Sequence, residues 1–187
     1  MVTERELRPR RVAIRPAMAG DARLLHRWRS EPSVRRHQPL QEASLSDLTS
    51  DLGRQRIEDL YSGRGERFQW IVLVDGEEAG WVTLAILSWE HSLAEIGYAL
   101  ATEYQNRGAM SAALALLLPD LLLSVGLERI EARCSVDNLA SQRVLEKLGF
   151  AREGRLKSYF LLHGRRVDNY LYALLRADYL LRRPGRL

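Results

Sequence analysis

The sequence predicts a mixed α/β domain, because strand-like runs and amphipathic helical segments follow one another along it. We expect the order β-α-α-β-β-β-α-β-α-β-β. Asp75-Gly76 and His163-Gly164 each separate two strand-like runs, which predicts two hairpins. The length of 187 residues suits one domain. We expect an N-terminal extension over residues 1–11, one domain over 12–179 and a C-terminal tail over 180–187.

The N-terminal part predicts one strand and two helices. Val12 and Ile14 alternate with other residues until Pro16 ends the strand. A helix follows, with Asp21 as its N-cap and an apolar face made by Leu24, Leu25 and Trp28. Residues 33–44 are polar and predict a loop, and a second helix is expected from about residue 46 to residue 61.

The centre of the chain predicts three strands and a helix. The strands are expected over residues 68–74, 79–87 and 94–100, and a polar turn over 102–108 leads into a helix from about Ala109. Pro119 lies inside this helical run and should kink it or split it.

The C-terminal part predicts a strand over 129–136 and a helix from Asn138 to Leu148, with Gly149 after its end. Two final strands are expected over 155–162 and 167–175.

The composition is that of a globular chain, with 46% hydrophobic and 28% charged residues. The single cysteine, Cys134, rules out an intrachain disulfide, so we expect a reducing, cytoplasmic location and a buried thiol. No apolar run approaches the ~18 residues of a membrane span. The net charge is +4, but basic and acidic residues interleave, which argues against nucleic acid as the main partner. No His or Cys pairing resembles a metal site, and we expect none.

The segment from Gln105 to Ser111 joins a strand to a helix and is a candidate anion site. Gly108 lets backbone N–H groups approach a ligand closely, Arg107 adds a cation, and the start of a helix presents unpaired N–H groups. Together these features suit a pyrophosphate. The alternative is that Gly108 only relieves a tight turn. The segment matches neither a Walker loop nor a GxGxxG fingerprint.

A second candidate is Asn138-x-x-Ser141, which opens a helix that ends in Leu148-Gly149-Phe150. Asn138 either caps the helix or contacts a ligand, and Ser141 either bonds the first turn or takes part in chemistry.

In order and spacing, these motifs resemble the GCN5-related N-acetyltransferase (GNAT) family, and within it the Rim-type branch that acetylates N-terminal amines of ribosomal proteins. Three further segments fit the same branch: Ile14-Arg15-Pro16, Ala94-Glu95-Ile96-Gly97-Tyr98 and Tyr172-Ala173-Leu174-Leu175. The resemblance covers about Val12 to Tyr179. It implies a central mixed, mostly antiparallel sheet of about seven strands with a splayed parallel pair, flanked by about four helices.

The resemblance implies acetyl-CoA as donor and co-substrate. The residues expected to bind it lie on a strand end, on the Gly108 segment and at Asn138; they are Ala99, Leu100, Gln105, Arg107, Gly108, Ala109, Met110, Ser111 and Asn138. A strand edge suits the pantetheine arm, because its amides can pair with main-chain groups.

Acetyl transfer needs a base, an oxyanion donor and a proton for the leaving thiolate. The resemblance points to Glu95 as the base, although Glu95 can equally serve only to pair with an arginine, and His37 and His91 are rival bases. A backbone N–H near Leu100 suits the oxyanion. Many family members place a tyrosine where this sequence has Leu145, so Ser141 is the candidate proton donor. Phe160 stands where the Rim branch can carry a glutamate, which weakens a water-holding serine–glutamate pair.

The acceptor is expected to be a primary amine, with the N-terminal α-amine of a peptide or protein favoured. His37, Trp89 and Tyr159 are the candidate acceptor-binding residues, and Arg35, Arg36 and Arg165 would make the surrounding cleft positive. Two alternatives stay open: a small-molecule amine acetyltransferase (amino acid, antibiotic or polyamine) and a non-catalytic acyl-CoA-binding module. The protein is expected to be a monomer or a homodimer.

Overall fold

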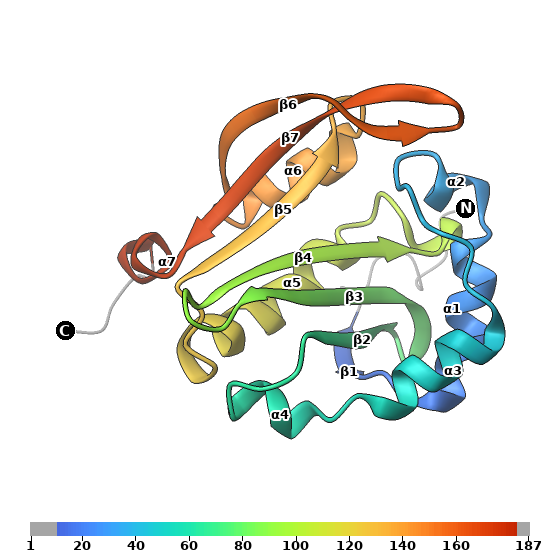
Figure 1. The fold of residues 1–187 in the computed structure, drawn as a ribbon, viewed down its shortest axis with the longest axis horizontal. Helices are drawn as coiled ribbons and strands as arrows, with labels where there is room; N and C mark the ends of the chain where they lie inside the picture. The colour runs from blue at the N-terminus through green and yellow to red at the C-terminus, as the bar shows by residue number, and fades with distance from the viewer. Residues whose placement is uncertain (1–10, 183–187) are drawn as a thin grey trace, which may run out of the picture.

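Seven strands form one sheet in the order β1-β2-β3-β4-β5-β7-β6 in the computed structural model, which describes residues 11–182 (Figure 1). Every neighbouring pair is antiparallel except β4 and β5. The mixed, mostly antiparallel sheet is therefore confirmed. The strands are β1 (Val12–Pro16), β2 (Arg67–Val74), β3 (Glu77–Ser88), β4 (Leu93–Leu100), β5 (Arg129–Ser135), β6 (Ala151–Leu162) and β7 (Arg165–Leu175).

Helices cover both faces of the sheet. The described residues hold seven α-helices, several of them short, where about four were expected. They are α1 (Ala22–Arg29), α2 (Pro32–Arg35), α3 (Leu45–Arg54), α4 (Ile57–Tyr61), α5 (Ala109–Pro119), α6 (Leu139–Lys147) and α7 (Arg176–Arg182). One hydrophobic cluster joins α1 and α3 to one face, and a larger cluster joins α5 and α6 to the other.

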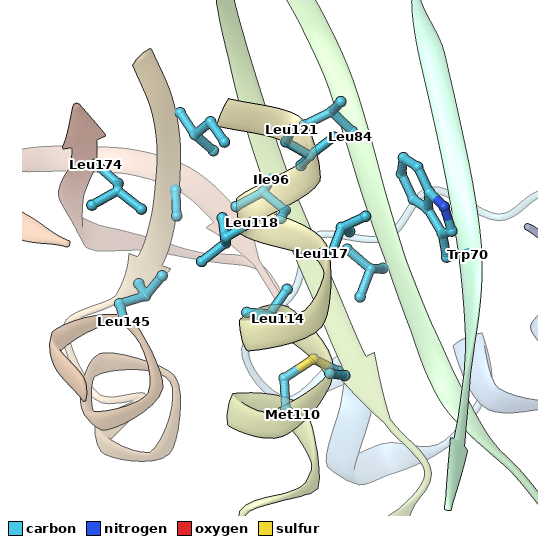
Figure 2. Close-up of a cluster of buried hydrophobic side chains, with 14 of the residues drawn as sticks. Trp70, Leu84, Ile96, Met110, Leu114, Leu117, Leu118, Leu121, Leu145 and Leu174 are labelled. Atoms are coloured by element: carbon cyan, nitrogen blue, oxygen red, sulfur yellow. The ribbon is translucent and has the colours of Figure 1, made fainter. Parts of the chain in front are cut away.

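The larger core lies between α5 and the strands (Figure 2). Leu114, Leu117 and Leu118 of α5 are almost completely buried against Leu84 and Ile96 of the sheet. Figure 2 shows these leucines facing the strands, with Leu145 of α6 and Leu174 of β7 beside them. Burial of each such side chain contributes about 1.5–3 kcal/mol. This packing fixes α5, and therefore the turn that precedes it, against β4.

The parallel pair β4–β5 is joined by only three residue pairs in the described sheet, the last of which is Glu95 with Glu131. Beyond Glu95 the two strands diverge, and Figure 1 shows the gap widening toward the end of β4. The expected splayed pair is thus present, and it opens the sheet between Ile96 and Leu100 on one side and the end of β5 on the other.

The region between β1 and β2 differs from the prediction. The single helix expected over residues 46–61 is two helices, because Gln55 is extended (φ −64°, ψ 130°). The Gln55 side chain accepts from the Gln69 N–H and donates to the Gln69 carbonyl, which holds the break against β2. The expected loop over 33–44 begins within α2, which Pro32 opens with its fixed φ.

Other differences concern element ends. Asp21 makes no side-chain cap of α1; it accepts from the Met18 N–H and pairs with Arg15. Pro119 ends α5, and a π-helical turn continues over residues 120–124, so the proline does interrupt the run. Strand β6 begins at residue 151 rather than 155. Helix α7 includes residues 180–182 of the expected tail, whereas residues 183–187 and residues 1–10 of the expected extension over 1–11 lie outside the described residues.

Candidate active site

A groove of about 610 Å³ lies where β4 and β5 separate. Its walls come from the end of β4, the start of α5, helix α6, and α2 with the segment that follows it. Eight of the nine residues expected to bind the donor line it, namely Ala99, Leu100, Gln105, Gly108, Ala109, Met110, Ser111 and Asn138. Arg107 is exposed and lies outside this lining, so the structure does not bring it together with the others.

The start of α5 is the strongest anion-binding feature of the groove. Gly108 is the N-cap, adopts the left-handed conformation (φ 77°) and has no side chain to offer the helix. A Cβ at Gly108 would meet no described atom within 4 Å, so neighbouring side chains within residues 11–182 do not seal the turn. The first N–H groups of such a helix are free donors at the positive end of its dipole. They therefore suit a phosphate or pyrophosphate in the groove.

The end of β4 presents main-chain groups to the same groove. The Ala101 N–H donates to the Ala79 carbonyl (2.8 Å). Since bonded and non-bonded pairs alternate along an antiparallel ladder, the peptide groups of Tyr98 and Leu100 are directed away from β3 and toward the gap. Their carbonyls accept from the side-chain amides of Gln38 (2.7 Å) and Gln105 (2.9 Å), respectively. These amides hold the strand end in place beside the gap.

A second cavity, of about 420 Å³, lies on the sheet face that carries Glu95. It shares five residues with the groove, which are His37, Gln38, Tyr98, Asn138 and Ser141. The two spaces therefore meet at the place where β4 leaves β5. A long ligand in the groove can present one end to a second molecule in this cavity.

Glu95 lies in the wall of the second cavity and pairs with Arg133 (Oε2 to Nη2, 3.0 Å). Burial raises the pKa of the Glu95 carboxyl above its ordinary value, Arg133 opposes the rise, and the nearby charge of Glu131 adds to it. Glu131 is itself held by Arg129 (2.9 Å). The structure thus contains the arginine pair, and it also gives the carboxylate a cavity to face; a role of Glu95 as the base stays a prediction.

Ser141 lies at the junction of the two spaces. Its backbone N–H donates to the side chain of Asn138 (3.1 Å), so Asn138 is the N-cap of α6. Its hydroxyl is 2.9 Å from the Tyr98 hydroxyl, and either oxygen can be the donor. Burial raises the pKa of Tyr98, so its phenol keeps its proton at neutral pH. The thiol of Cys134 is also buried beside Ser141, and burial raises its pKa to about 11.

The candidate acceptor residues are not all brought together. His37 lines both spaces, and burial, together with the charge of Arg36, lowers its pKa. Trp89 lies outside both, and its indole Nε1 donates to the Gly65 carbonyl (2.7 Å). Tyr159 also lines neither, but its hydroxyl accepts from Arg133 (2.8 Å), the partner of Glu95. His91, the other rival base, is exposed in the turn between β3 and β4.

The arginines that make the second cavity positive are not the ones that were expected from the sequence. Arg36 lines the groove instead, and Arg35 and Arg165 line neither space. Arg29 at the end of α1 and Arg67 at the start of β2 line the cavity, and so does Arg133.

Sequence reasoning missed Arg29, Arg67, Gln38 and the position of Tyr98. The position of Tyr98 could have been predicted, since this residue directly precedes Ala99 on the expected strand. The others required the strand register and the course of the segment after α2.

Within residues 11–182, no group of three or more His, Cys, Asp or Glu side chains is arranged to hold a metal ion. None of the helices in the same part of the chain is long and apolar enough to cross a membrane.

Comparisons with known proteins agree with this geometry. A family described as "Acetyltransferase (GNAT) domain" matches residues 11–151. The "Uncharacterized N-acetyltransferase p20" of Bacillus licheniformis is 31% identical over 170 residues, which is 90% of this chain and 95% of that protein. The "Spermidine N(1)-acetyltransferase" of Escherichia coli K12 is 27% identical over 169 residues, 90% of this chain and 88% of that protein. The solved structure of Mycobacterium smegmatis RimJ with a CoA-disulfide has a TM-score of 0.73 and 26% identity, and the match covers 91% of this chain and 88% of that one.

Proposed function

The chain belongs to the GNAT acetyltransferase family, and from this premise we propose that it transfers acetyl from acetyl-CoA to a primary amine by direct attack, with the N-terminal α-amine of a peptide or protein as the favoured acceptor. The family makes it an acetyl-CoA-dependent acyltransferase, so the alternative of a non-catalytic binding module is set aside.

One observation carries the proposal. The groove and the second cavity share the walls formed by Tyr98 and Ser141. The free N–H groups of α5 lie at the far end of the groove, and Glu95 lies in the second cavity. A donor whose phosphates lie at the start of α5 therefore has its reactive end directed to the space that Glu95 lines.

The residues of the groove fit the donor. The start of α5, from Gly108 to Ser111, would bind the pyrophosphate, and the peptide group of Leu100 would pair with a pantetheine amide. Acetyl-CoA supplies an activated acetyl group as a thioester. The Tyr98 N–H is also directed toward the gap and lies two residues nearer to Glu95 along β4, so it can donate to the thioester carbonyl oxygen as negative charge develops there.

Glu95 would act as the general base and receive the proton that the attacking amine loses, either directly or through a water. Burial raises the pKa of the Glu95 carboxyl, so its carboxylate is a stronger base than that of an exposed glutamate, and the charges of Arg133 and Arg67 oppose the rise. The nitrogen then forms its bond to the acetyl carbon as the carbon–sulfur bond breaks.

Ser141 would donate its hydroxyl proton to the leaving thiolate while the Tyr98 hydroxyl, 2.9 Å away, passes its proton to the Ser141 oxygen. Tyr98 would regain a proton from solvent once CoA has left, so both hydroxyls are restored before the next turnover. Leu145, where many family members have a tyrosine, is buried in the core and takes no part. Phe160 lines the second cavity, so no glutamate stands at that position to hold a water with Ser141.

The test is a thiol-release assay with acetyl-CoA and a panel of N-terminal peptides, amino acids, aminoglycosides and spermidine. We expect peptides to give the highest kcat/KM. E95Q should lower kcat by about 10²–10⁴-fold, the usual contribution of a general base, and leave the KM for acetyl-CoA nearly unchanged. The matched control E90Q removes an exposed carboxylate outside both spaces and should behave as wild type.

Unchanged turnover in E95Q together with a large loss in H37Q would move the base to His37. A clear preference for spermidine, which the name of the Escherichia coli relative suggests, would replace the peptide acceptor by a polyamine. The buried free thiol of Cys134 supports the expected cytoplasmic location, because a single cysteine leaves the fold without an intrachain disulfide to maintain.

A further inference from the structure

Two arginines that line the second cavity, beside Glu95, form no ion pair among the described residues. Arg29 is the last residue of α1 and Arg67 is the first of β2, and both line the cavity beside Glu95. Among residues 11–182, Glu95 forms its ion pair with Arg133, whereas Arg29 and Arg67 form none; the charge of Arg67 still acts on Glu95 from a distance and lowers the pKa of that carboxyl. Arg29 donates a hydrogen bond to the Gln41 carbonyl (3.0 Å), which uses one of its five N–H groups.

The two guanidinium groups are close enough to affect each other. Burial lowers the pKa of Arg29, and the charges of Arg67 and Arg35 lower it further. Within the described chain, Glu95 is the only acidic residue in the lining of the cavity, and it is already paired. Arg29 is half-buried and Arg67 is exposed, so the cost of bringing the like charges together falls mainly on Arg29, and an anion between the two would relieve it. The cavity is therefore prepared for a negative group that the described residues do not supply.

The strand register places this positive wall at a defined distance from Glu95. Arg67 pairs with Ala85, and Ala85 pairs with Glu95, so the three lie in one row across the same face of the sheet. Two strand spacings separate the backbones of Arg67 and Glu95 by about 10 Å. The small side chain of Ala85 leaves the space between them open. A molecule with its amine near Glu95 can thus reach the arginines with a group a few bonds away.

From this arrangement we propose that the acceptor carries a carboxylate as well as the amine, and that Arg29 and Arg67 bind that carboxylate. The proposal rests on the proposed function, since it assumes that the amine reacts beside Glu95. The carboxylate belongs either to a free amino acid or to an acidic side chain near the N-terminus of a peptide. A polyamine is disfavoured, because its second cationic group would lie against two guanidinium groups.

The experiment compares matched acceptors that differ by one charge. Ser-Glu-Ala-Ala amide is set against Ser-Gln-Ala-Ala amide, serine against serinamide, and spermidine is the cationic reference. Charge-assisted hydrogen bonds predict that the carboxylate member of one pair has a kcat/KM about 10–100-fold higher in the wild type. R29M and R67M should reduce this ratio toward one and leave the KM for acetyl-CoA unchanged. The control R23M removes an exposed arginine of the same helix as Arg29 and should keep the ratio.

The outcomes separate the two proposals. If only the first pair differs, with serine reacting faster than serinamide, the acceptor is a free amino acid. If only the second pair differs, with the Glu peptide reacting faster than the Gln peptide, the acceptor is an acidic peptide. Either result supports the proposal that the acceptor carries a carboxylate. Equal rates within both pairs, or a ratio that R29M and R67M leave intact, would overturn it while the transferase assignment stands. Calorimetry of the N-acetylated products in the presence of CoA gives a second readout. If every acceptor fails to react and every product fails to bind, both proposals fail, provided that thermal melts report folded variants.

Discussion

Gly80 of β3 controls the position of the strand end that faces the donor groove. A Cβ at this position would stand 2.2 Å from the Ala99 carbonyl oxygen and 2.8 Å from the Leu100 Cα. Both atoms belong to the backbone, so no side-chain rotation can relieve the contact. Ordinary contact begins near 3.4 Å, so Gly80→Ala must move β4 and β3 apart by about 1.2 Å. The predicted effect is a displaced Ala99–Leu100 segment in an otherwise folded domain.

The expected magnitudes follow from that displacement. Overpacking of this kind costs about 1–3 kcal/mol, which in a chain of this size lowers Tm by about 3–10 °C. The displacement weakens one or two main-chain hydrogen bonds to the donor, each worth about 0.5–1.5 kcal/mol, so the Kd for acetyl-CoA should rise by about 2–150-fold. Gly154→Ala is the control, because a Cβ on this β6 glycine meets no described atom within 4 Å.

Differential scanning fluorimetry gives the Tm and isothermal titration calorimetry gives the Kd for acetyl-CoA. If Gly80→Ala matches Gly154→Ala in both, the close approach of β3 and β4 has no consequence and the reasoning is wrong. A lower Tm with an unchanged Kd would refute the more specific claim that the end of β4 holds the donor.

Two further changes test the catalytic residues. Arg133→Met removes a cation that opposes the rise in the pKa of Glu95, so this pKa should rise further. Because a base must be deprotonated to act, the acid limb of the pH profile of kcat/KM should move to higher pH. An acid limb that does not move would exclude Glu95 as the titrating group. Tyr98→Phe removes the hydroxyl beside Ser141, so kcat should fall by about 10-fold while the KM for acetyl-CoA changes little. Single-turnover and steady-state assays measure both quantities. If the variant and the wild type have equal kcat values, the Ser141 proton has another source.

Much of the fold follows from local chemistry that a sequence displays. Asp75 and Gly76 both adopt positive φ in the β2–β3 hairpin, which these residue types accept more readily than others. Gly108 does the same before α5, and the almost unbroken apolar sequence of α5 is typical of a buried helix. The strands that carry Glu95 and the donor groove were therefore predictable.

The parts that were missed depend on contacts between distant segments. The break at Gln55 exists because its amide binds the backbone of Gln69, and no helix propensity signals this. Trp89 was expected at the acceptor on the basis of its place beside β4, but its indole is turned to Gly65. Arg67 enters the site only because β2, β3 and β4 align it with Glu95, and that register is a property of the whole sheet.

Within residues 11–182, the three residue pairs that join β4 to β5 are the only ladder between one group of four strands and another of three. The sheet thus consists of two groups of strands joined by a short parallel ladder. Beyond this ladder, the facing edges of β4 and β5 carry peptide groups that have no neighbouring described strand to bond. A thioester donor seated there would act as a missing strand and tie the halves together. Binding of the donor should therefore restrain the two groups of strands relative to each other, and the separation of β4 and β5 beyond Glu95 would then contribute to the alignment of the reacting ends of the two substrates.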